Sequence, residues 1–249
     1  MYSNQEAIEL FNQMTAMGAY YDSGRPIAVD PDIIIKDVLS KLKVSREDII
    51  LDVGCGTGVV TFPLARHCAF VHALDAGAKV IEKARERAKQ ENIKNIAYYQ
   101  GSALALPFER DSFDHVLMYA VIHYLENEAQ VSQCVAELVR VCKPGGRILI
   151  AEIPDHRVRL EFEKRAKTPQ EARMLEHYKN NRAEYDRLAK EHVRVVTGTN
   201  SLVLDCQRIC AEGVKLGCRS EVLLQDIRQP FSLTRRDVLL VKHKEGTDL

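Results

Sequence analysis

Three glycines at alternate positions, and one aspartate about twenty residues later, are the residues of this sequence that could bind a ligand together. The glycines stand at 54, 56 and 58, directly after the apolar run of residues 49 to 53. Glycine is needed where the backbone takes a positive φ, or where a ligand approaches the main chain closer than a Cβ permits. A helix N-terminus after such a turn presents free N–H groups. The stretch therefore predicts a strand, a tight turn and a helix start across which a polar small molecule binds.

The aspartate, Asp75, closes a second apolar segment at residues 69 to 74. An acid at this distance from the glycines is placed to accept hydrogen bonds from the two vicinal hydroxyls of a ribose. A carboxylate accepts both bonds without competing as a donor. A solvated acid at a strand end is the alternative interpretation, but the order and distance of the two features favour a nucleoside-containing cofactor.

The spacing of the glycines separates two classes of such cofactor. Dinucleotide-binding turns follow G-x-G-x-x-G with the third glycine inside the helix, whereas here Val59 and Val60 follow Gly58. A nicotinamide cofactor therefore fits poorly. Residues 51 to 58, LDVGCGTG, resemble instead the first motif of the class I S-adenosylmethionine-dependent methyltransferases. Taken without the rest of the motif, the glycines could also be a purely structural corner.

The resemblance continues in order through residues 49 to 153, about two fifths of the chain. Residues 101 to 108, GSALALPF, are similar to the family's adenine loop, which usually reads G-D-A-x-x-L-P-F. Residues 113 to 116, FDHV, are similar to its F-D-x-V strand, and residues 143 to 146, KPGG, to the turn before its fifth strand. The family implies S-adenosylmethionine as the cofactor and S-adenosylhomocysteine as the product.

The resemblance also implies which residues contact the cofactor. They are Asp52, Gly54, Cys55, Gly56 and Gly58 in and before the turn, Asp75 and Ala76, Ser102 and the Ala103 backbone, Tyr119 at the end of the fourth strand, and Tyr20 and Tyr21 in an N-terminal lid. Ser102 stands where the family usually has aspartate; its hydroxyl can accept from the adenine amine but lacks the charge that strengthens such a bond. Ordinary packing of an N-terminal helix is the alternative for the two tyrosines.

Methyl transfer from a sulfonium requires positioning more than acid–base chemistry, so a missing catalytic dyad does not contradict this interpretation. If the acceptor arrives protonated, His123 is the first candidate for a general base, because it follows the fourth strand and titrates near neutral pH. A packing or pocket role for His123 is the alternative. Candidate acceptor-binding residues are Tyr124, His156, Arg157, Arg159 and Tyr178.

Composition narrows the class of protein. The 249 residues carry 35 Lys and Arg against 35 Asp and Glu, and this zero net charge makes an obligate nucleic-acid partner unlikely. No run of about 18 apolar residues and no signal peptide is seen, so we expect a cytoplasmic protein with no membrane partner. Seven cysteines without a C-x-x-C pair predict reduced core residues and no metal site. The oligomeric state is not indicated.

These patterns predict a single doubly wound α/β domain with a seven-stranded, mostly parallel sheet. Residues 1–47 should form an N-terminal helical cover, 48–153 the cofactor-binding core, 154–198 a helical substrate-lid insertion, and 199–249 the last helix and a closing strand hairpin. Within these ranges the apolar pattern predicts helices at residues 5–18, 59–67 and 201–216, a fifth strand at 147–153, and the two strands of the closing pair at 220–227 and 237–243.

Three classes of function remain open. A small molecule is favoured, since no N-P-P-Y-like sequence follows the fourth strand and no recognition domain is appended. An RNA or protein methyltransferase would use the mildly basic residues 156–194 as a docking face, and strongly salt-dependent binding of nucleic acid would reveal it. A non-catalytic relative would bind the cofactor without turnover.

Overall fold

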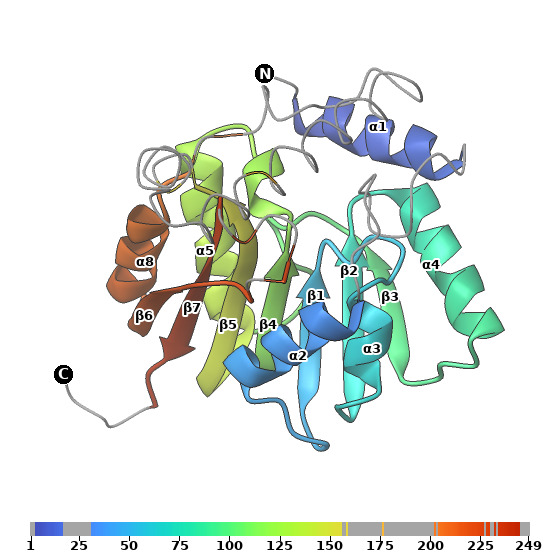
Figure 1. The fold of residues 1–249 in the computed structure, drawn as a ribbon, viewed down its shortest axis with the longest axis horizontal. Helices are drawn as coiled ribbons and strands as arrows, with labels where there is room; N and C mark the ends of the chain where they lie inside the picture. Colours follow the sequence, from blue (N-terminus) through green and yellow to red (C-terminus); the bar gives the residue numbers. More distant parts are fainter. Residues whose placement is uncertain are drawn as a thin grey trace.

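The chain folds around one seven-stranded sheet (Figure 1). The computed structural model describes residues 3–16, 31–155, 158, 176, 202, 204–226, 228–229, 232 and 234–244. The strand order is β3-β2-β1-β4-β5-β7-β6, with β7 antiparallel to both neighbours and the other described pairs parallel. The strands are β1 (Ile49–Val53), β2 (Phe70–Asp75), β3 (Ile96–Gln100), β4 (Phe113–Tyr119), β5 (Cys142–Pro154), β6 (Cys218–Leu223) and β7 (Arg235–Lys242). This sheet confirms the predicted doubly wound α/β fold.

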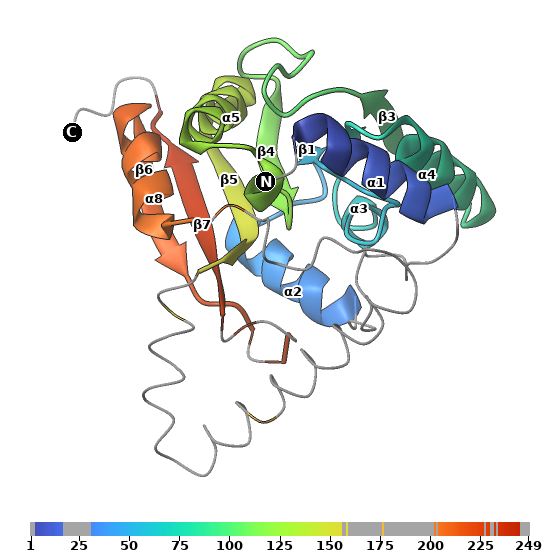
Figure 2. The ribbon, with the colours of Figure 1, turned by 90° about the horizontal axis from the view of Figure 1, so that it is seen from above.

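Helices cover both faces of the sheet (Figures 1 and 2). One face carries α2 (Pro31–Leu42), α3 (Thr61–Ala65) and α4 (Ala78–Gln90), and the other carries α5 (Glu128–Val141) and α8 (Cys206–Lys215). A short 3₁₀ helix, η1 (Ile122–Tyr124), follows β4. The N-terminal helix α1 (Asn4–Ala16) lies across the end of the sheet at which the parallel strands terminate, as Figure 2 shows from above.

The central strands are apolar on both sides because both sides are covered. In β1, Ile50 packs into the cluster under α2 and α3, and the adjacent Leu51 packs into the cluster under α5; both side chains are fully buried. Full burial of one such side chain contributes about 1.5–3 kcal/mol. A near-continuous apolar run is therefore what a doubly covered parallel strand requires.

All seven cysteines are buried and reduced, as the sequence predicted. Burial raises the pKa of several of these thiols, to about 12 for Cys134, so they behave as small apolar side chains. Among the helices of the described residues, none combines the length and the apolar character needed to cross a membrane.

Several element boundaries differ from those that the sequence pattern predicted. The helix expected from residue 59 begins at Thr61, because the chain is still turning at Gly58, whose φ is +97°. Its Pro63 then falls in the first turn, where a backbone N–H would have no partner. The helix expected from residue 201 begins at Cys206, where Asp205 caps it by accepting from Gln207 N at 3.0 Å.

The strands near the C-terminus also shift. The fifth strand was expected from residue 147 but begins at Cys142, which already pairs with Phe113. The strands expected at 220–227 and 237–243 correspond to β6 and β7. The first of them begins earlier than expected, at Cys218, and ends at Leu223. The predicted helical insertion at 154–198, apart from residues 154, 155, 158 and 176, and the end of the N-terminal helix beyond residue 16 lie outside the described residues.

Lys242 of β7 binds backbone carbonyl groups at the C-terminal end of α5, and this contact gives a prediction about stability. Its Nζ donates to Val139 O at 2.9 Å, Cys142 O at 2.7 Å and Asp111 Oδ1 at 2.5 Å. A cation here satisfies carbonyl groups that the helix cannot pair itself. We expect Lys242→Met to lower the free energy of unfolding by about 2 kcal/mol, measured by urea denaturation.

Lys215 is the matched control for this substitution. It lies in the last turn of α8 and, like Lys242, pairs with an acid, here Glu212, but its side chain is 68% exposed. Lys215→Met should change the free energy of unfolding by less than about 0.5 kcal/mol. Equal effects of the two substitutions would contradict the role given to Lys242.

Candidate cofactor site

The glycine turn after β1 has positive φ at each of its three glycines: +78° at Gly54, +55° at Gly56 and +97° at Gly58. A Cβ added at Gly54 would lie 2.2 Å from Val121 Cγ2, and one at Gly58 would lie 2.2 Å from the Phe62 ring. At these two positions glycine is needed because neighbouring side chains of the protein occupy the space of a Cβ. A Cβ at Gly56 would meet no atom within 4 Å, so only this glycine presents its backbone to open space.

Neighbouring elements hold the turn in place. Gly54 N and Cys55 N both donate to Leu74 O of β2, at 2.7 and 3.1 Å. From α4, Arg87 Nη1 donates to Thr57 O at 3.1 Å. The turn is therefore fixed before any ligand binds, which lowers the entropic cost of binding.

Asp75 at the end of β2 joins the three segments that surround the site. Its Oδ2 accepts from Gly56 N at 3.0 Å, and its Oδ1 accepts from Gly77 N, before α4, at 2.9 Å. Its backbone oxygen accepts from Gly101 N, after β3, at 3.0 Å. Each carboxylate oxygen has a second lone pair, so Asp75 can still accept from two ligand hydroxyls.

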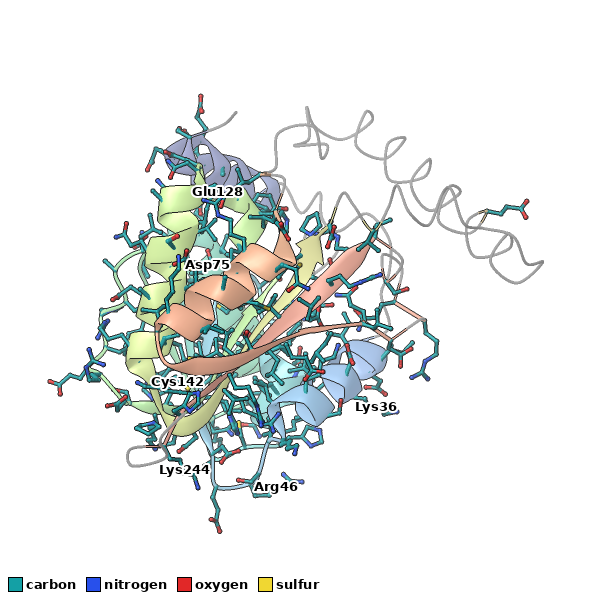
Figure 3. The ribbon with its side chains drawn as sticks, turned by 90° about the vertical axis from the view of Figure 1, so that its left-hand side faces the viewer. Lys36, Arg46, Asp75, Glu128, Cys142 and Lys244 are labelled. Carbon is teal, nitrogen blue, oxygen red and sulfur yellow. The ribbon has the colours of Figure 1, made fainter. Side chains whose placement is uncertain are left out.

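The electrostatics of Asp75 fit a hydroxyl-binding acid. Burial raises the pKa of its carboxyl, and the N–H groups of Gly77 and Gly56 act against this rise by favouring the charged form. Asp75 lies toward the end of the molecule that carries α1, whereas Arg46 and Lys244 mark the opposite end (Figure 3).

Beneath the turn, Asp52 is buried, and its Oδ2 accepts from Thr61 Oγ1 at 2.6 Å. Burial raises the pKa of this carboxyl to about 7, and the Thr61 bond acts against the rise. Asp52 is thus poised between its two charge states at neutral pH. A ligand cation near it would favour the ionised form.

The raised pKa of Asp52 makes stability depend on pH. Because the folded state binds the Asp52 proton more tightly than the unfolded chain does, the stability it contributes is complete below about pH 4 and is lost as the pH rises through about 7. Between pH 4 and pH 8, we expect the free energy of unfolding of ligand-free wild-type protein to fall by up to about 4 kcal/mol relative to that of Asp52→Asn. Urea denaturation at four pH values measures this difference.

A control separates Asp52 from the other acids. Glu47 is exposed at the opposite end of the sheet, before β1. The free energy of unfolding of Glu47→Gln should change with pH in the same way as that of wild type. If the free energy of unfolding of Asp52→Asn also follows that of wild type, the burial of a protonated Asp52 is contradicted.

The loop after β3, the predicted adenine loop, is clamped from α5. Arg140 donates to Phe108 O at 2.7 Å and to Leu106 O at 3.0 Å, and Glu137 accepts from Leu106 N at 2.7 Å. Ser102 is exposed, and its Oγ accepts from Leu104 N at 3.1 Å. Its oxygen has a second lone pair that can accept from the adenine amine, so an adenine contact by Ser102 remains a prediction, as does that of the Ala103 backbone.

The predicted Cys55 and Tyr119 side chains have partners within the protein. Cys55 packs with Ala73 and Ile81 under the turn. The Tyr119 ring packs on the α2 side of the sheet, and its hydroxyl donates to Gln229 Oε1 at 3.1 Å. If these two residues contact the cofactor, we expect their backbone groups to do so.

After β4 the chain turns sharply at Ala120, whose φ is +60°, a strained value for a residue with a Cβ. His123 in η1 is 5% exposed, and its ring centroid lies 4.3 Å from that of Tyr124. Tyr124 also packs edge-to-face on Phe11 of α1, with 5.1 Å between centroids. His123 and Tyr124 thus form one wall with α1.

The sequence interpretation missed a buried polar cluster at the ends of β5 and β7. Glu152 is fully buried with φ +63°, its N donates to Asp237 Oδ1 at 2.9 Å, and Arg235 Nε lies 3.0 Å from its Oε2. Lys41 bridges Asp37 and Asp237 at 2.6 and 2.7 Å. Charged residues inside the apolar runs 148–153 and 237–241 were the signal that could have revealed it.

The remaining predicted positions lie outside the described residues: Tyr20, Tyr21, His156, Arg157, Arg159 and Tyr178. The described part brings together the glycine turn, Asp75, Ala76 and the 101–103 loop at one end of the sheet. This arrangement fits an adenosine ligand: Asp75 offers acceptors to the ribose, and the open backbone at Gly56 permits close approach.

Comparisons with known proteins agree with this geometry. Residues 51–150 match the model of a methyltransferase domain. The chain is 41% identical over 106 residues to demethylmenaquinone methyltransferase of Lactococcus lactis, which covers 41% of each protein. It is 31% identical over 157 residues to methyltransferase GfsG of Streptomyces halstedii, which covers 59% of this chain and 55% of that protein. The chain thus spans about half the length of the curated relatives it matches.

Among solved structures, the fold is similar to that of Haemonchus contortus phosphoethanolamine N-methyltransferase 1 in complex with phosphoethanolamine and S-adenosylhomocysteine. The TM-score is 0.66 at 16% identity, and the match covers all of this chain and 51% of that one. At this identity the likeness concerns the fold. The matched model identifies residues 51–150 as a methyltransferase domain, and the fold agrees with the resemblance of this region to the class I S-adenosylmethionine-dependent methyltransferases.

Proposed function

We propose that this protein transfers a methyl group from S-adenosylmethionine to a small-molecule acceptor. The observation that carries the proposal is the Asp75 carboxylate, which faces the site while it holds Gly56 N and Gly77 N at 3.0 and 2.9 Å. Besides holding these two backbone groups, an acid at this position meets the need of a ribose for hydrogen-bond acceptors.

Two further observations support a small acceptor. The Lactococcus lactis relative is named for demethylmenaquinone, and the solved neighbour contains phosphoethanolamine, both small molecules. The zero net charge gives no general attraction to nucleic acid. In doubly wound sheets ligands lie beyond the carboxyl ends of the strands, so we infer that the acceptor lies near the ends of β4 and β5.

The chain's part in the reaction is to bind, orient and exclude water. When bound, S-adenosylmethionine supplies a methyl carbon on a sulfonium, a leaving group that needs no protonation. Asp75 and the glycine turn fix the adenosine half, and the wall formed by η1 and α1 limits access of water. Orientation of this kind contributes up to about 7–11 kcal/mol in model reactions.

His123 is the proposed proton acceptor when the acceptor atom arrives with a proton. Its support is its place directly after β4 and its imidazole, a side chain that can accept a proton. If so, His123→Gln lowers kcat at neutral pH and removes the acidic limb of the pH profile while S-adenosylmethionine still binds.

The proposal is tested in two stages. Calorimetric titration with S-adenosylmethionine, S-adenosylhomocysteine and NADH should give heat with the first two only. Transfer of labelled methyl is then followed with 1,4-naphthohydroquinone, phosphoethanolamine and a structured RNA. Binding with transfer to either small molecule supports the proposal. No binding of either adenosyl compound by folded protein overturns it, and transfer to RNA alone overturns the small-molecule part.

A further inference from the structure

Helix α4 lacks a cap of its own at the end that faces the cofactor site. Its N-cap residue is Gly77, in an extended conformation at φ −82°, ψ 111°, with no side chain to accept a hydrogen bond. The first N–H groups of a helix have no partner within it, and a side-chain oxygen at the N-cap normally accepts from one of them. Here that partner comes from elsewhere in the sequence.

Asn12 of α1 supplies the missing acceptor. Its Oδ1 accepts from Lys79 N, the second residue of α4, at 3.1 Å. A glycine at position 77 leaves room for this contact, because a Cβ there would lie 3.0 Å from Asn12 Oδ1 and 2.8 Å from Val80 Cγ2. The neighbouring Phe11 packs on Tyr124, so α1 is fastened at adjacent residues to the segments after β2 and after β4.

The strand between these two segments is β1, whose glycine turn would hold the ligand. Figure 2 shows α1 passing over this end of the sheet, beside the start of α4. Gly77 N also donates to Asp75 Oδ1 at 2.9 Å. A continuous path therefore runs from Asn12 through the first turn of α4 to the carboxylate that would bind the ribose.

We propose that Asn12 is a positioning residue that couples the docking of α1 to the occupancy of the cofactor site. This inference rests on the proposed function. Asn12 acts on the cofactor site through α4 and Asp75, and its hydrogen bond holds α1 in place over this end of the sheet. Because coupling is reciprocal, α1 docking strengthens ligand binding by the same factor by which the ligand strengthens α1 docking.

Two variants of equal side-chain size isolate the hydrogen bond. Asn12→Leu keeps the bulk and removes the acceptor, whereas Asn12→Asp keeps an acceptor that is at least as good at an N-cap. Glu9→Ala, at an exposed position of the same helix, is the control. Each variant is titrated calorimetrically with S-adenosylhomocysteine, and hydrogen exchange of the α1 amides is measured with and without saturating ligand.

We expect Asn12→Leu to weaken S-adenosylhomocysteine binding by about three- to tenfold, and Asn12→Asp and Glu9→Ala by less than about twofold. In wild type the ligand should slow α1 exchange, and in Asn12→Leu this slowing should shrink by the same factor as the affinity. A merely structural cap would lower the melting temperature without changing affinity or ligand-dependent exchange, and that result overturns the inference. If wild type binds no adenosyl ligand at all, the proposed function itself fails.

Discussion

Asp75→Ala is expected to weaken binding of S-adenosylhomocysteine by at least about a hundredfold. The carboxylate would accept two ribose hydroxyls, and a hydrogen bond to a charged group contributes about 1.5–3 kcal/mol, so the pair amounts to about 3–6 kcal/mol. The substitution also releases Gly56 N and Gly77 N from the atoms that hold them. Loss of the preformed turn adds to the loss of the contacts, and calorimetric titration measures the sum.

Asp75→Asn separates the two parts of this effect. The amide matches the carboxylate in shape and keeps one accepting oxygen, so the variant should stay folded, with one backbone bond intact. Its affinity should lie between those of wild type and Asp75→Ala, because it has lost the charge. Unchanged affinity in both variants, with an unchanged melting temperature, would exclude Asp75 from the cofactor site and remove the main support for the proposed function.

The glycines at 54 and 56 should respond in opposite ways to substitution. Gly54→Ala forces a Cβ to within 2.2 Å of Val121 Cγ2 at φ +78°, and we expect a loss of about 3–5 kcal/mol in the free energy of unfolding. Gly56→Val meets no protein atom near its Cβ, so it should cost only about 1–2 kcal/mol for its positive φ. Its branched side chain would instead occupy the space of the ligand and abolish binding of S-adenosylhomocysteine.

Urea denaturation and calorimetric titration of the two variants test this contrast. Val121→Ala offers a control, because the double variant Gly54→Ala/Val121→Ala should recover part of the stability lost in Gly54→Ala. If Gly56→Val binds the ligand as wild type does, the open space at Gly56 is not the cofactor's place. If Gly54→Ala is as stable as wild type, the close approach of Val121 is not a constraint.

The sequence alone determined the fold class and predicted the centre of the candidate site. Apolar runs of five to seven residues can be read as strands because both faces of the sheet are covered, as Ile50 and Leu51 illustrate. The glycine turn and Asp75 were predictable because their function depends on residue type and on short distances along the chain. A positive φ needs glycine, and a ribose needs an acceptor at a strand end.

The tertiary structure decided which glycine of the turn presents its backbone to open space and what surrounds the candidate site. Gly54 and Gly56 look alike in the sequence, and only Val121, distant along the chain, distinguishes them. Likewise the contact of Lys79 with Asn12 and that of Asp237 with Lys41 join segments far apart in the chain. Such partners are chosen by packing in three dimensions, and no local pattern records them, because the hydrogen bond forms only once the sheet has brought both segments together.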